Sequence, residues 1–454
     1  MESGQDIRNK DGGKKDAVFE KIEKDKVRFV NLQFSDLFGM VKSIMIPARH
    51  LDNALEHGAW FDGSSVEGFA RIHESDMYLK PDASTYAVIP WMDSPDGNTA
   101  RFICDIFSPD NQPFKGDPRH ILKKALLEAE ALGFEFKTGP EMEFFLFKRD
   151  DGALKPLPHD RGGYFDFTSD QAYNIRRDMN VALEAFGINV EASHHEVALG
   201  QHEIDFRYDN ALKAADSAMT LRSVLKAVAQ KHDLHATFMA KPIAGINGSG
   251  MHVNQSLFSG KKNAFYDESD KYSLSKTAYS YIAGQLAHAP GMAAILSPTV
   301  NSYKRLVPGY EAPVYISWAR INRSALMRIP KISSGKPSST RIELRCPDPT
   351  CNIYLAFAVM LKAGLDGIKK GMEPPEPVEE NLFHFDDKKL EAMDIRTLPG
   401  SLGDALEEMA MDPIAKEALG EHAFSRYMEA KKKEWDSYRL HVSSWELENY
   451  LEKY

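Results

Sequence analysis

The feature that most constrains this fold is a two-residue alternation of carboxylates with hydrophobic side chains. The segment GPEMEFFLF, residues 139–147, places Glu141 and Glu143 on either side of a methionine. Side chains alternate between the two faces of an extended chain, so both carboxylates share one face and Met142 and Phe144 share the other. The segment therefore predicts a strand with one face on the core. Its acidic face is either an ordinary solvent-facing surface or a cation site.

The same alternation recurs in two later segments. HHEVALGQHEIDFRY, residues 194–208, carries Glu196 and Glu203, and TRIELRCPDP, residues 340–349, carries Glu343 between two arginines. Carboxylate oxygens select hard cations such as Mg²⁺ or Mn²⁺, and guanidinium groups match phosphate or carboxylate. Periodicity alone fits solvated sheet faces and a shared polar cavity equally well. In the second case, metal ions and arginines without a covalent nucleophile would be typical of phosphoryl transfer.

Composition narrows the class of protein. The chain has 454 residues, of which 43% are hydrophobic and 27% charged, which predicts a globular protein of two or three domains. A net charge of −10 argues against a nucleic-acid backbone as partner. Three cysteines are too few for a disulfide framework or a zinc motif, which fits a reducing cytosol. We find neither a signal peptide nor a stretch approaching the roughly 20 apolar residues of a membrane helix, so we expect a cytoplasmic protein.

Turn and helix signals divide the chain into three parts. We expect a flexible tail over residues 1–16, a strand-rich N-terminal domain over 17–110 and a larger α+β domain over 111–454. The joint at 108–120 is rich in Pro and Gly, and Asp117-Pro118 predicts a helix start there. Further helices are predicted near residues 170–187, 211–232, 275–295 and 350–370, and from 413 to the end. Strands are predicted near residues 27–47, 87–107, 190–208, 236–254 and 340–346.

Two loops are candidates for ligand contact. AGINGSGMHVNQSL, residues 244–257, is glycine-rich and leads into His252, but it lacks the Gly-Lys-Ser/Thr of a phosphate-binding P-loop. A histidine on a strand is by itself more often a structural hydrogen-bonding residue than a metal ligand. YKRLVPGYEAPVY, residues 303–315, carries Arg305 and Glu311, and it is either a surface loop or a lid.

Taken together, these segments resemble the glutamine synthetases, specifically the type I enzymes of bacteria and archaea. The motifs occur in the family's order and cover the chain from about residue 20 to 454. Besides the segments quoted above, they are WFDGSSVEGF (60–69), ESDMYLKPD (74–82), RLVPGYEAPVY (305–315) and ARINRSALMRIP (319–330). The resemblance implies an N-terminal β-grasp domain and a catalytic domain in which helices flank an open antiparallel sheet.

The resemblance also implies an activity and an assembly. The reaction is the ATP-dependent ligation of ammonia to L-glutamate through γ-glutamyl phosphate, a step of nitrogen assimilation. It uses ATP as co-substrate and two or more Mg²⁺ or Mn²⁺ ions per active site. The implied assembly is a homododecamer of two hexameric rings with active sites between subunits, and its C-terminal helix reaches into the opposite ring. Regulatory proteins are possible partners, whereas nucleic acid and membranes are not.

The resemblance assigns roles residue by residue. Six residues match the metal ligands: Glu143, Glu196 and Glu203 for a first ion, and Glu141, His252 and Glu343 for a second, nearer the nucleotide phosphates. Four match substrate-binding positions: Asn247 and Gly248 for the amino end of glutamate, and Arg305 and Arg345 for its carboxylates. Four match catalytic positions: Arg323 and Arg341 at the transferred phosphate, Asp62 at the ammonium site across the subunit interface, and Glu311 in the lid.

Some features bear on subtype and on alternative functions. Phe383 stands where adenylylated relatives have a tyrosine, and the stretch between Glu143 and Glu196 is short. Both features resemble the alpha subtype, which is controlled by feedback inhibition by glutamine, and there Arg71 matches the arginine associated with that control. The alternatives are a γ-glutamyl ligase of the same superfamily that uses another amine, or an inactive scaffold. The presence of Asp62, Glu311 and the complete set of metal ligands favours the synthetase.

Overall fold

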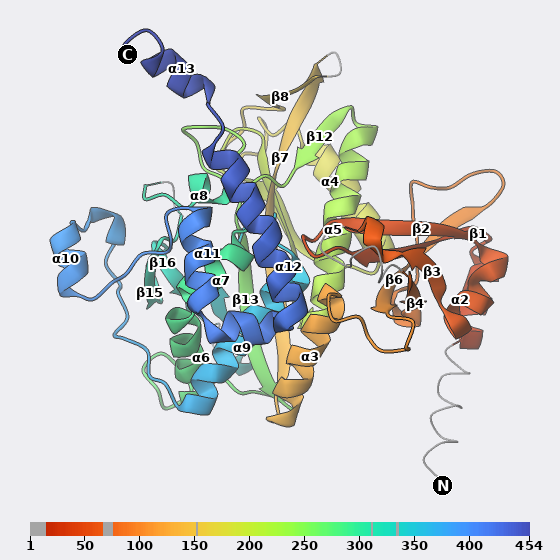
Figure 1. Ribbon diagram of the computed structural model, residues 1–454, viewed down its shortest axis with the longest axis horizontal. Coiled ribbons are helices and arrows are strands. Elements are labelled where there is room, and N and C mark those ends of the chain that lie inside the picture. Colours follow the sequence, from red (N-terminus) through yellow and green to blue (C-terminus); the bar gives the residue numbers. More distant parts are fainter. Residues whose placement is uncertain (1–14, 67–75, 151–152, 310–311, 333–335) are drawn as a thin grey trace.

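The structure is a computed structural model, and it describes residues 15–66, 76–150, 153–309, 312–332 and 336–454. Figure 1 shows a smaller N-terminal domain, in red and orange, beside a larger domain in which helices pack on a long sheet. This two-part α+β organisation confirms the predicted fold class. No helix among the described residues is long and apolar enough to cross a membrane.

The N-terminal domain is built on a six-stranded mixed sheet. Its order is β2-β1-β6-β4-β3, with β5 also paired to β6. The hairpin predicted over residues 27–47 forms β1 and β2, which pair antiparallel, while β1 and β6 are parallel. One face of the sheet packs around Leu32 and Phe102, both fully buried. The elements are β1 (Val27–Ser35), β2 (Val41–Pro47), α2 (Leu51–His57), β3 (Ala59–Asp62), β4 (Asp76–Pro81), β5 (Ala87–Val88) and β6 (Asn98–Phe107).

The larger domain has an eleven-stranded sheet centred on β7. The order along the sheet is β15-β16-β17-β13-β7-β10-β9; β8, β11 and β12 also pair with β7, and β14 pairs with β13. All recorded pairs are antiparallel except β15 with β16. The strands are β7 (Glu135–Asp150), β8 (Ala153–Pro158), β9 (Val190–His195), β10 (Gln201–Phe206), β11 (Asp209–Asn210), β12 (Leu234–Thr237), β13 (Met251–Ser259), β14 (Lys262–Asn263), β15 (Tyr315–Ala319), β16 (Ala325–Arg328) and β17 (Ile342–Leu344).

Helices cover one face of this sheet and form the main core with it. Met142, Phe144 and Ile204, the hydrophobic alternates of the acidic strands, are fully buried in that core. The opposite face is therefore left for the carboxylates. The helices are α3 (Pro118–Ala131), α4 (Tyr173–Ala185), α5 (Ala211–Lys231), α6 (Lys276–Ala287), α7 (Ala289–Leu296), α8 (Ser302–Arg305), α9 (Ile353–Lys370), α10 (Asp387–Ala392), α11 (Leu402–Met411), α12 (Pro413–Arg439) and α13 (Ser444–Tyr450).

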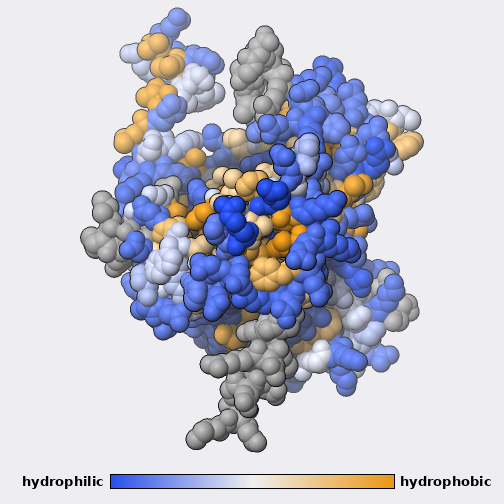
Figure 2. Space-filling view, turned by 90° about the vertical axis from the view of Figure 1, so that its right-hand side faces the viewer, coloured by the Kyte–Doolittle hydropathy of each residue, from blue (hydrophilic) through white to orange (hydrophobic). Residues whose placement is uncertain are grey.

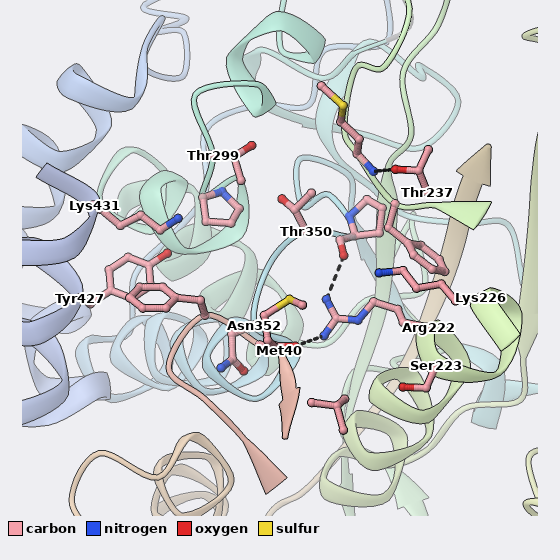
Figure 3. Close-up of a pocket in the computed structure, with 17 residues that line it drawn as sticks. Met40, Arg222, Ser223, Lys226, Thr237, Thr299, Thr350, Asn352, Tyr427 and Lys431 are labelled. Carbon is pink, nitrogen blue, oxygen red and sulfur yellow. Dashed lines mark hydrogen bonds between the residues drawn. The ribbon is translucent and has the colours of Figure 1, made fainter. Parts of the chain in front are cut away.

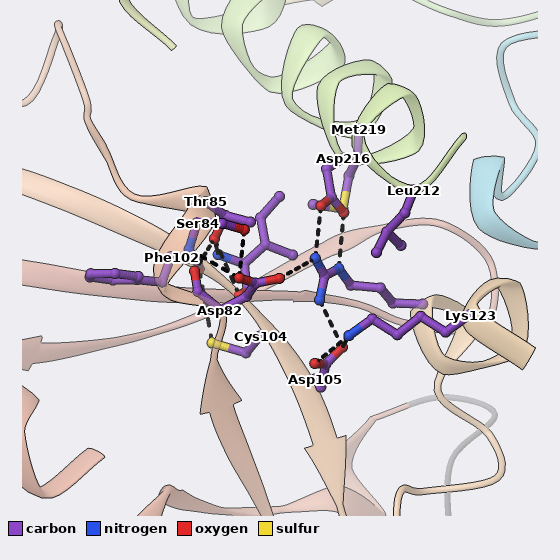
Figure 4. Close-up of polar contacts among 12 residues, drawn as sticks. Asp82, Ser84, Thr85, Phe102, Cys104, Asp105, Lys123, Leu212, Asp216 and Met219 are labelled. Atoms are coloured by element: carbon purple, nitrogen blue, oxygen red, sulfur yellow. Dashed lines mark hydrogen bonds and ion pairs between the residues drawn. The ribbon is translucent and has the colours of Figure 1, made fainter. Parts of the chain in front are cut away.

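A buried arginine joins the two domains. Arg119, in the first turn of α3, contacts Asp82 and Asp105 of the N-terminal domain at 2.8 Å and Asp216 of α5 at 2.9 Å (Figure 4). Its side chain is only 3% exposed. A guanidinium has five N–H donors in a fixed fork, so it can bind carboxylates from several directions at once. This cluster sets the orientation of the N-terminal sheet on the larger domain.

A second junction lies at the β1–β2 turn. Arg222 of α5 donates to the carbonyl of Gly39 in that turn at 2.8 Å and to the carbonyl of Pro349 at 3.1 Å. A cavity of about 490 Å³ opens beside it, between the turn, α5 and α12 (Figure 3). The turn requires Gly39, because its φ is +83° and a Cβ there would lie 2.9 Å from the backbone of Asn352.

Candidate active site

Two strands beside β7 complete its acidic face. In the β10–β7 pair, Glu203 lies opposite Glu143, and in the β13–β7 pair His252 lies opposite Glu141. Glu343 lies on β17, the next strand beyond β13. The predicted strands are thus neighbours in one sheet. Their period of two brings the predicted metal ligands to a common face.

The first cluster contains the three glutamates predicted for the first ion. A bridging imidazole joins two of them: the His194 ring nitrogens lie 3.6 Å from Glu196 Oε1 and 3.5 Å from Glu203 Oε1. Glu143 Oε2 accepts hydrogen bonds from Gln201 Nε2 at 2.8 Å and from the Gly250 amide at 2.9 Å. Glu143 and Glu203 are 9% and 8% exposed. The carboxyl groups of Glu143 and Glu203 are therefore largely shielded from water.

Crowding makes these carboxyls hard to ionise. Burial raises the pKa of Glu143, and the charge of Glu196 raises it further. Burial also raises the pKa of Glu203, to which the charges of Glu143 and Glu141 add. A cation bound between these groups would reverse the effect by favouring their charged forms.

The second cluster combines two glutamates and a histidine. His252 Nδ1 lies 3.4 Å from Glu141 Oε2 and 3.7 Å from Glu343 Oε1. Burial, and then the charge of Arg345, lowers the pKa of His252, so its imidazole is neutral and has a free lone pair. Burial is the largest single influence on Glu141 and would raise its pKa, but the contacts with His252, the hydrogen bond from Asn254 and the charge of Arg328 together lower it.

The donor chemistry of both clusters fits hard divalent cations. The three residues of the second cluster each offer one ligand atom, all within 4.8 Å of one another. Oxygen-rich sets with one imidazole suit Mg²⁺ or Mn²⁺ better than soft metals. The pKa values raised by burial and by mutual repulsion in the first cluster point to the same need for positive charge.

Two residues in these clusters lie outside the metal-ligand set that the sequence indicated. His194 bridges the first cluster, and Asp205 extends it, since His194, Glu203 and Asp205 also offer ligand atoms within 4.8 Å of one another. Burial and the charge of Glu203 raise the pKa of Asp205 to about 9. The signal was present in the alternation of Glu203, Asp205 and Arg207, since residues two apart on a strand share a face.

A pocket of about 330 Å³ adjoins the second cluster. It lies between β7, β10, β13 and the segment before β17, and Glu141, Asp205 and Arg341 line it. Arg341 Nε donates to Asn254 Oδ1 at 2.9 Å, and Asn254 Nδ2 donates to Glu141 Oε1 at 2.8 Å. This chain of contacts links the pocket to the carboxylates, so a phosphate-bearing ligand here would reach both.

The remaining arginines differ in how they are engaged. Arg345 is 6% exposed; its Nη1 lies 3.1 Å from Glu343 Oε1, and its buried Nε has no hydrogen-bond partner among the described residues. Arg305 is 5% exposed and donates to the backbone carbonyls of residues 345–347. Arg323 is exposed. Its positive charge acts to lower the pKa values of Tyr164 and Arg345, so its side chain lies near both, beside the acidic face of the sheet.

The glycine-rich loop packs directly on Arg305. A Cβ on Gly250 would lie 2.5 Å from Arg305 Nη2, and one on Gly248 would lie 2.2 Å from the carbonyl of Ala240. The Gly248 carbonyl accepts from Gln201 Nε2 at 3.1 Å. Asn247, next to Gly248, is half-buried. The loop therefore sits against the first cluster, as expected for a substrate-contacting segment.

Asp62 lies away from the clusters, and two other predicted residues cannot be placed relative to them. Asp62 ends β3 of the N-terminal sheet, and its recorded hydrogen bonds run only to Ser64 and Ser65. Among the described residues, no hydrogen bond or ion pair joins Asp62 to either acidic cluster of its own chain. Glu311 and Arg71 lie outside the described residues.

Acidic clusters that fit divalent cations, beside a pocket lined by Arg341, match what an enzyme of the phosphoryl-transfer class requires. Comparison with known proteins makes this specific. The family model "glutamine synthetase, catalytic domain" matches residues 115–450, and "glutamine synthetase, beta-Grasp domain" matches residues 26–109. The chain belongs to the glutamine synthetase family. It catalyses the ATP-dependent synthesis of glutamine from glutamate and ammonia.

Individual relatives agree along nearly the whole chain. Glutamine synthetases of Clostridium saccharobutylicum and Thermotoga maritima are 51% and 53% identical over 442 and 434 residues, which covers 97% and 95% of this chain and 99% and 98% of theirs. The structure of the Plasmodium falciparum glutamine synthetase superposes with a TM-score of 0.86 at 26% identity, covering 96% of this chain and 98% of that one. A GmaS–ADP complex superposes with a TM-score of 0.84 at 30% identity, covering 95% and 99%.

Proposed function

We propose that the acidic face makes glutamine in two steps through γ-glutamyl phosphate. A carboxylate is a poor electrophile for ammonia, so the γ-carboxylate must first receive a phosphoryl group from ATP. The observation that carries this proposal is the register of β10, β7 and β13, which sets Glu203 beside Glu143 and His252 beside Glu141. The nucleotide would bind in the adjoining pocket, with Arg341 at its phosphates.

Two or more Mg²⁺ or Mn²⁺ ions would be held on this face. The residues that would hold them are Glu143, Glu196 and Glu203 in the first cluster, and Glu141, His252 and Glu343 in the second. When bound, such ions offset phosphate charge and polarise the transferring group. The neutral imidazole of His252 and the raised pKa values of Glu143 and Glu203 support this assignment.

Glutamate would bind between the glycine-rich loop and the arginines. Arg345 supports this best, because its buried Nε has no partner among the described residues and could bind a carboxylate. Arg305 is already engaged with backbone carbonyls, so it would orient the wall of the site as well as attract the substrate. Asn247 and Gly248 would receive the amino end of glutamate.

Phosphoryl transfer requires positive charge at the γ-phosphate. Arg341 lines the nucleotide pocket, and Arg323 is exposed beside the acidic face, so the two could meet the phosphate from either side. Fixed guanidinium groups stabilise developing charge without having to reorganise during the reaction.

The ammonium site would be completed by a second subunit. Asp62 is exposed, its pKa is lowered by hydrogen bonds from Ser64 and Ser65, and it is therefore an anion able to attract ammonium. We assign Glu311 to a lid that excludes water, which would otherwise hydrolyse the acyl phosphate.

We extend the proposal to a homododecamer of two hexameric rings in the cytoplasm. The C-terminal helix α13 projects from the molecule, and Trp445 and Leu451 are 59% and 72% exposed (Figure 1). Figure 2 faces the side on which the N-terminal domain lies and shows a hydrophobic patch with hydrophilic residues around it. Exposed hydrophobic surface of this kind marks protein interfaces. We also assign the chain to the alpha subtype, which Phe383 supports. Feedback inhibition by glutamine through Arg71 and control by partner proteins belong to the same proposal.

A product assay with ATP, Mg²⁺, glutamate and either ammonium or small primary amines tests this function. We expect glutamine and ADP with ammonium, and hydroxylamine should trap the activated acyl group as γ-glutamyl hydroxamate. Preference for a larger amine would instead make the chain a γ-glutamyl-amine ligase. Failure to turn over any amine would favour a scaffold.

A further inference from the structure

A chain of buried hydrogen bonds lies behind Glu196. His195, the residue before it, is 1% exposed and ends β9. Its Nδ1 lies 2.6 Å from the carbonyl oxygen of Glu196, and its Nε2 lies 2.7 Å from Asp160 Oδ1. The Glu196 carbonyl can only accept, so Nδ1 carries a proton and donates to it, while Nε2 is held by the carboxyl group of Asp160, which is 3% exposed.

The loop after β8 holds this imidazole in place. The Phe165 amide donates to the carbonyl of His195 at 3.3 Å, and a Cβ on Gly162 would lie 3.0 Å from the ring. The ring therefore has little room to turn. Its orientation is determined by the loop that carries Asp160, and not by strand geometry alone.

A third buried residue, His202, invites a metal-site interpretation that the contacts oppose. Asp160, His195 and His202 each have a potential ligand atom, all within 4.8 Å of one another. However, Arg176 Nη1 lies 3.0 Å from His202 Nδ1, and an arginine can only donate. His202 Nδ1 therefore accepts and its Nε2 carries the proton, which leaves no lone pair for a metal. The guanidinium charge nearby opposes a cation as well.

We propose that His195 and Asp160 are positioning residues for Glu196, an inference that rests on the proposed role of Glu196 as a metal ligand. The backbone amide of Glu196 donates to the Gln201 carbonyl at 2.8 Å, and the backbone carbonyl of Glu196 accepts from His195. Both backbone polar groups of Glu196 are therefore held by hydrogen bonds. A fixed backbone sets the direction of the Cα–Cβ bond of Glu196, and with it the direction from which the carboxylate reaches the first cluster. Partners that orient a ligand in this way typically contribute 10- to 100-fold in metal affinity.

Direct Mn²⁺ binding to the assembled enzyme, followed by the electron paramagnetic resonance signal of free Mn²⁺, tests this inference. The amide nitrogen of His195→Asn occupies the Nδ1 position and keeps the bond to Glu196, whereas that of His195→Gln reaches only the Nε2 position. We expect His195→Gln to weaken one class of Mn²⁺ site about 10- to 100-fold. His195→Asn should stay close to wild type, and Asp160→Asn should weaken the same class.

The matched control is a second His–Asp pair, in which His232 Nε2 lies 3.0 Å from Asp178 Oδ2. The side chains of this pair are 35% and 40% exposed. His232→Gln should leave Mn²⁺ binding unchanged. If Glu196→Ala removes a class of site but His195→Gln and Asp160→Asn bind Mn²⁺ like wild type, the positioning role is wrong and the ligand assignment survives. If Glu196→Ala itself changes nothing, the ligand assignment fails, and this inference fails with it.

Discussion

At the scale of single residues, Glu343 contacts two arginines and also lies beside the histidine of the second cluster. It is 2% exposed and contacts Arg328 at 2.6 Å and Arg345 at 3.1 Å, besides lying near His252. Because it is buried between two arginines, Glu343 also contributes to the stability of the fold. Removing one partner of a buried ion pair costs about 3–5 kcal/mol, because the other charge is left unpaired.

Glu343→Gln therefore tests the metal role better than truncation, since it keeps the shape and part of the hydrogen bonding. We expect glutamine synthesis to fall at least about 100-fold, the range seen when a fixed electrostatic group is lost. Synthesis rate and thermal unfolding should be measured on the same preparation. If the variant assembled and kept full activity, Glu343 would not be a metal ligand of the second cluster.

Proton release on metal binding is a second prediction at this scale. Asp205 has a pKa raised to about 9, and Glu143 and Glu203 are raised as well. At neutral pH the metal-free cluster therefore holds protons that a cation displaces. Calorimetric titration with Mg²⁺ in two buffers of different ionisation enthalpy should show proton release near pH 7 that declines as pH rises through 9. Asp205→Asn should release fewer protons, and buffer-independent heats would contradict the prediction.

At the scale of elements, His288 connects the start of α7 with α9 and α12. Its Nδ1 lies 2.8 Å from Asp412 Oδ2 and its Nε2 lies 3.1 Å from Asp366 Oδ2. Burial alone would lower its pKa, but the bonds to Asp412 and Asp366 outweigh it and raise the pKa above the ordinary 6.5. The stabilisation is therefore complete below pH 6.5 and is lost as pH rises through the folded-state pKa.

His288→Gln should reveal this dependence. We expect the variant to lose about 1.5–3 kcal/mol at pH 6, the range for hydrogen bonds between charged groups, and clearly less at pH 9. Thermal unfolding at both values, on wild type and variant, gives the comparison. A difference between the two proteins that does not change with pH would mean that the ring is neutral in the folded protein.

Local patterns predicted most of the elements, and long-range pairing explains what they missed. The helix expected over 275–295 is two helices, α6 and α7, because Pro290 lies in the first turn of a new helix after His288. The local patterns did not predict β15 and β16, which pair in parallel although only residues 320–324 connect them. The acidic face was visible in the spacing of Glu141, Glu143 and Glu203, whereas the bridging role of His194 required the β9–β10 register.

At the scale of the whole molecule, the position of Asp62 bears on whether one subunit or two neighbouring subunits form a complete active site. Arg119 and its aspartates fix the N-terminal sheet on the catalytic domain. No contact is recorded between Asp62 and the acidic face among the described parts of the chain. If Asp62 acts at all, it acts in the site of a neighbour. Asp62→Ala should then impair ammonium use more than ATP or glutamate binding.

Mixed assemblies test the sharing of sites. Asp62→Ala and Glu343→Gln subunits, each nearly inactive alone, should be unfolded, mixed in equal amounts and reassembled. A site regains function only where an Asp62→Ala subunit supplies the catalytic face and a Glu343→Gln subunit supplies Asp62, so random mixing in a cyclic ring should restore about a quarter of wild-type activity. Wild type mixed with either variant controls for losses in refolding. If Asp62 served its own chain, no subunit in the mixture would carry both residues, and the mixture would stay as inactive as its parts.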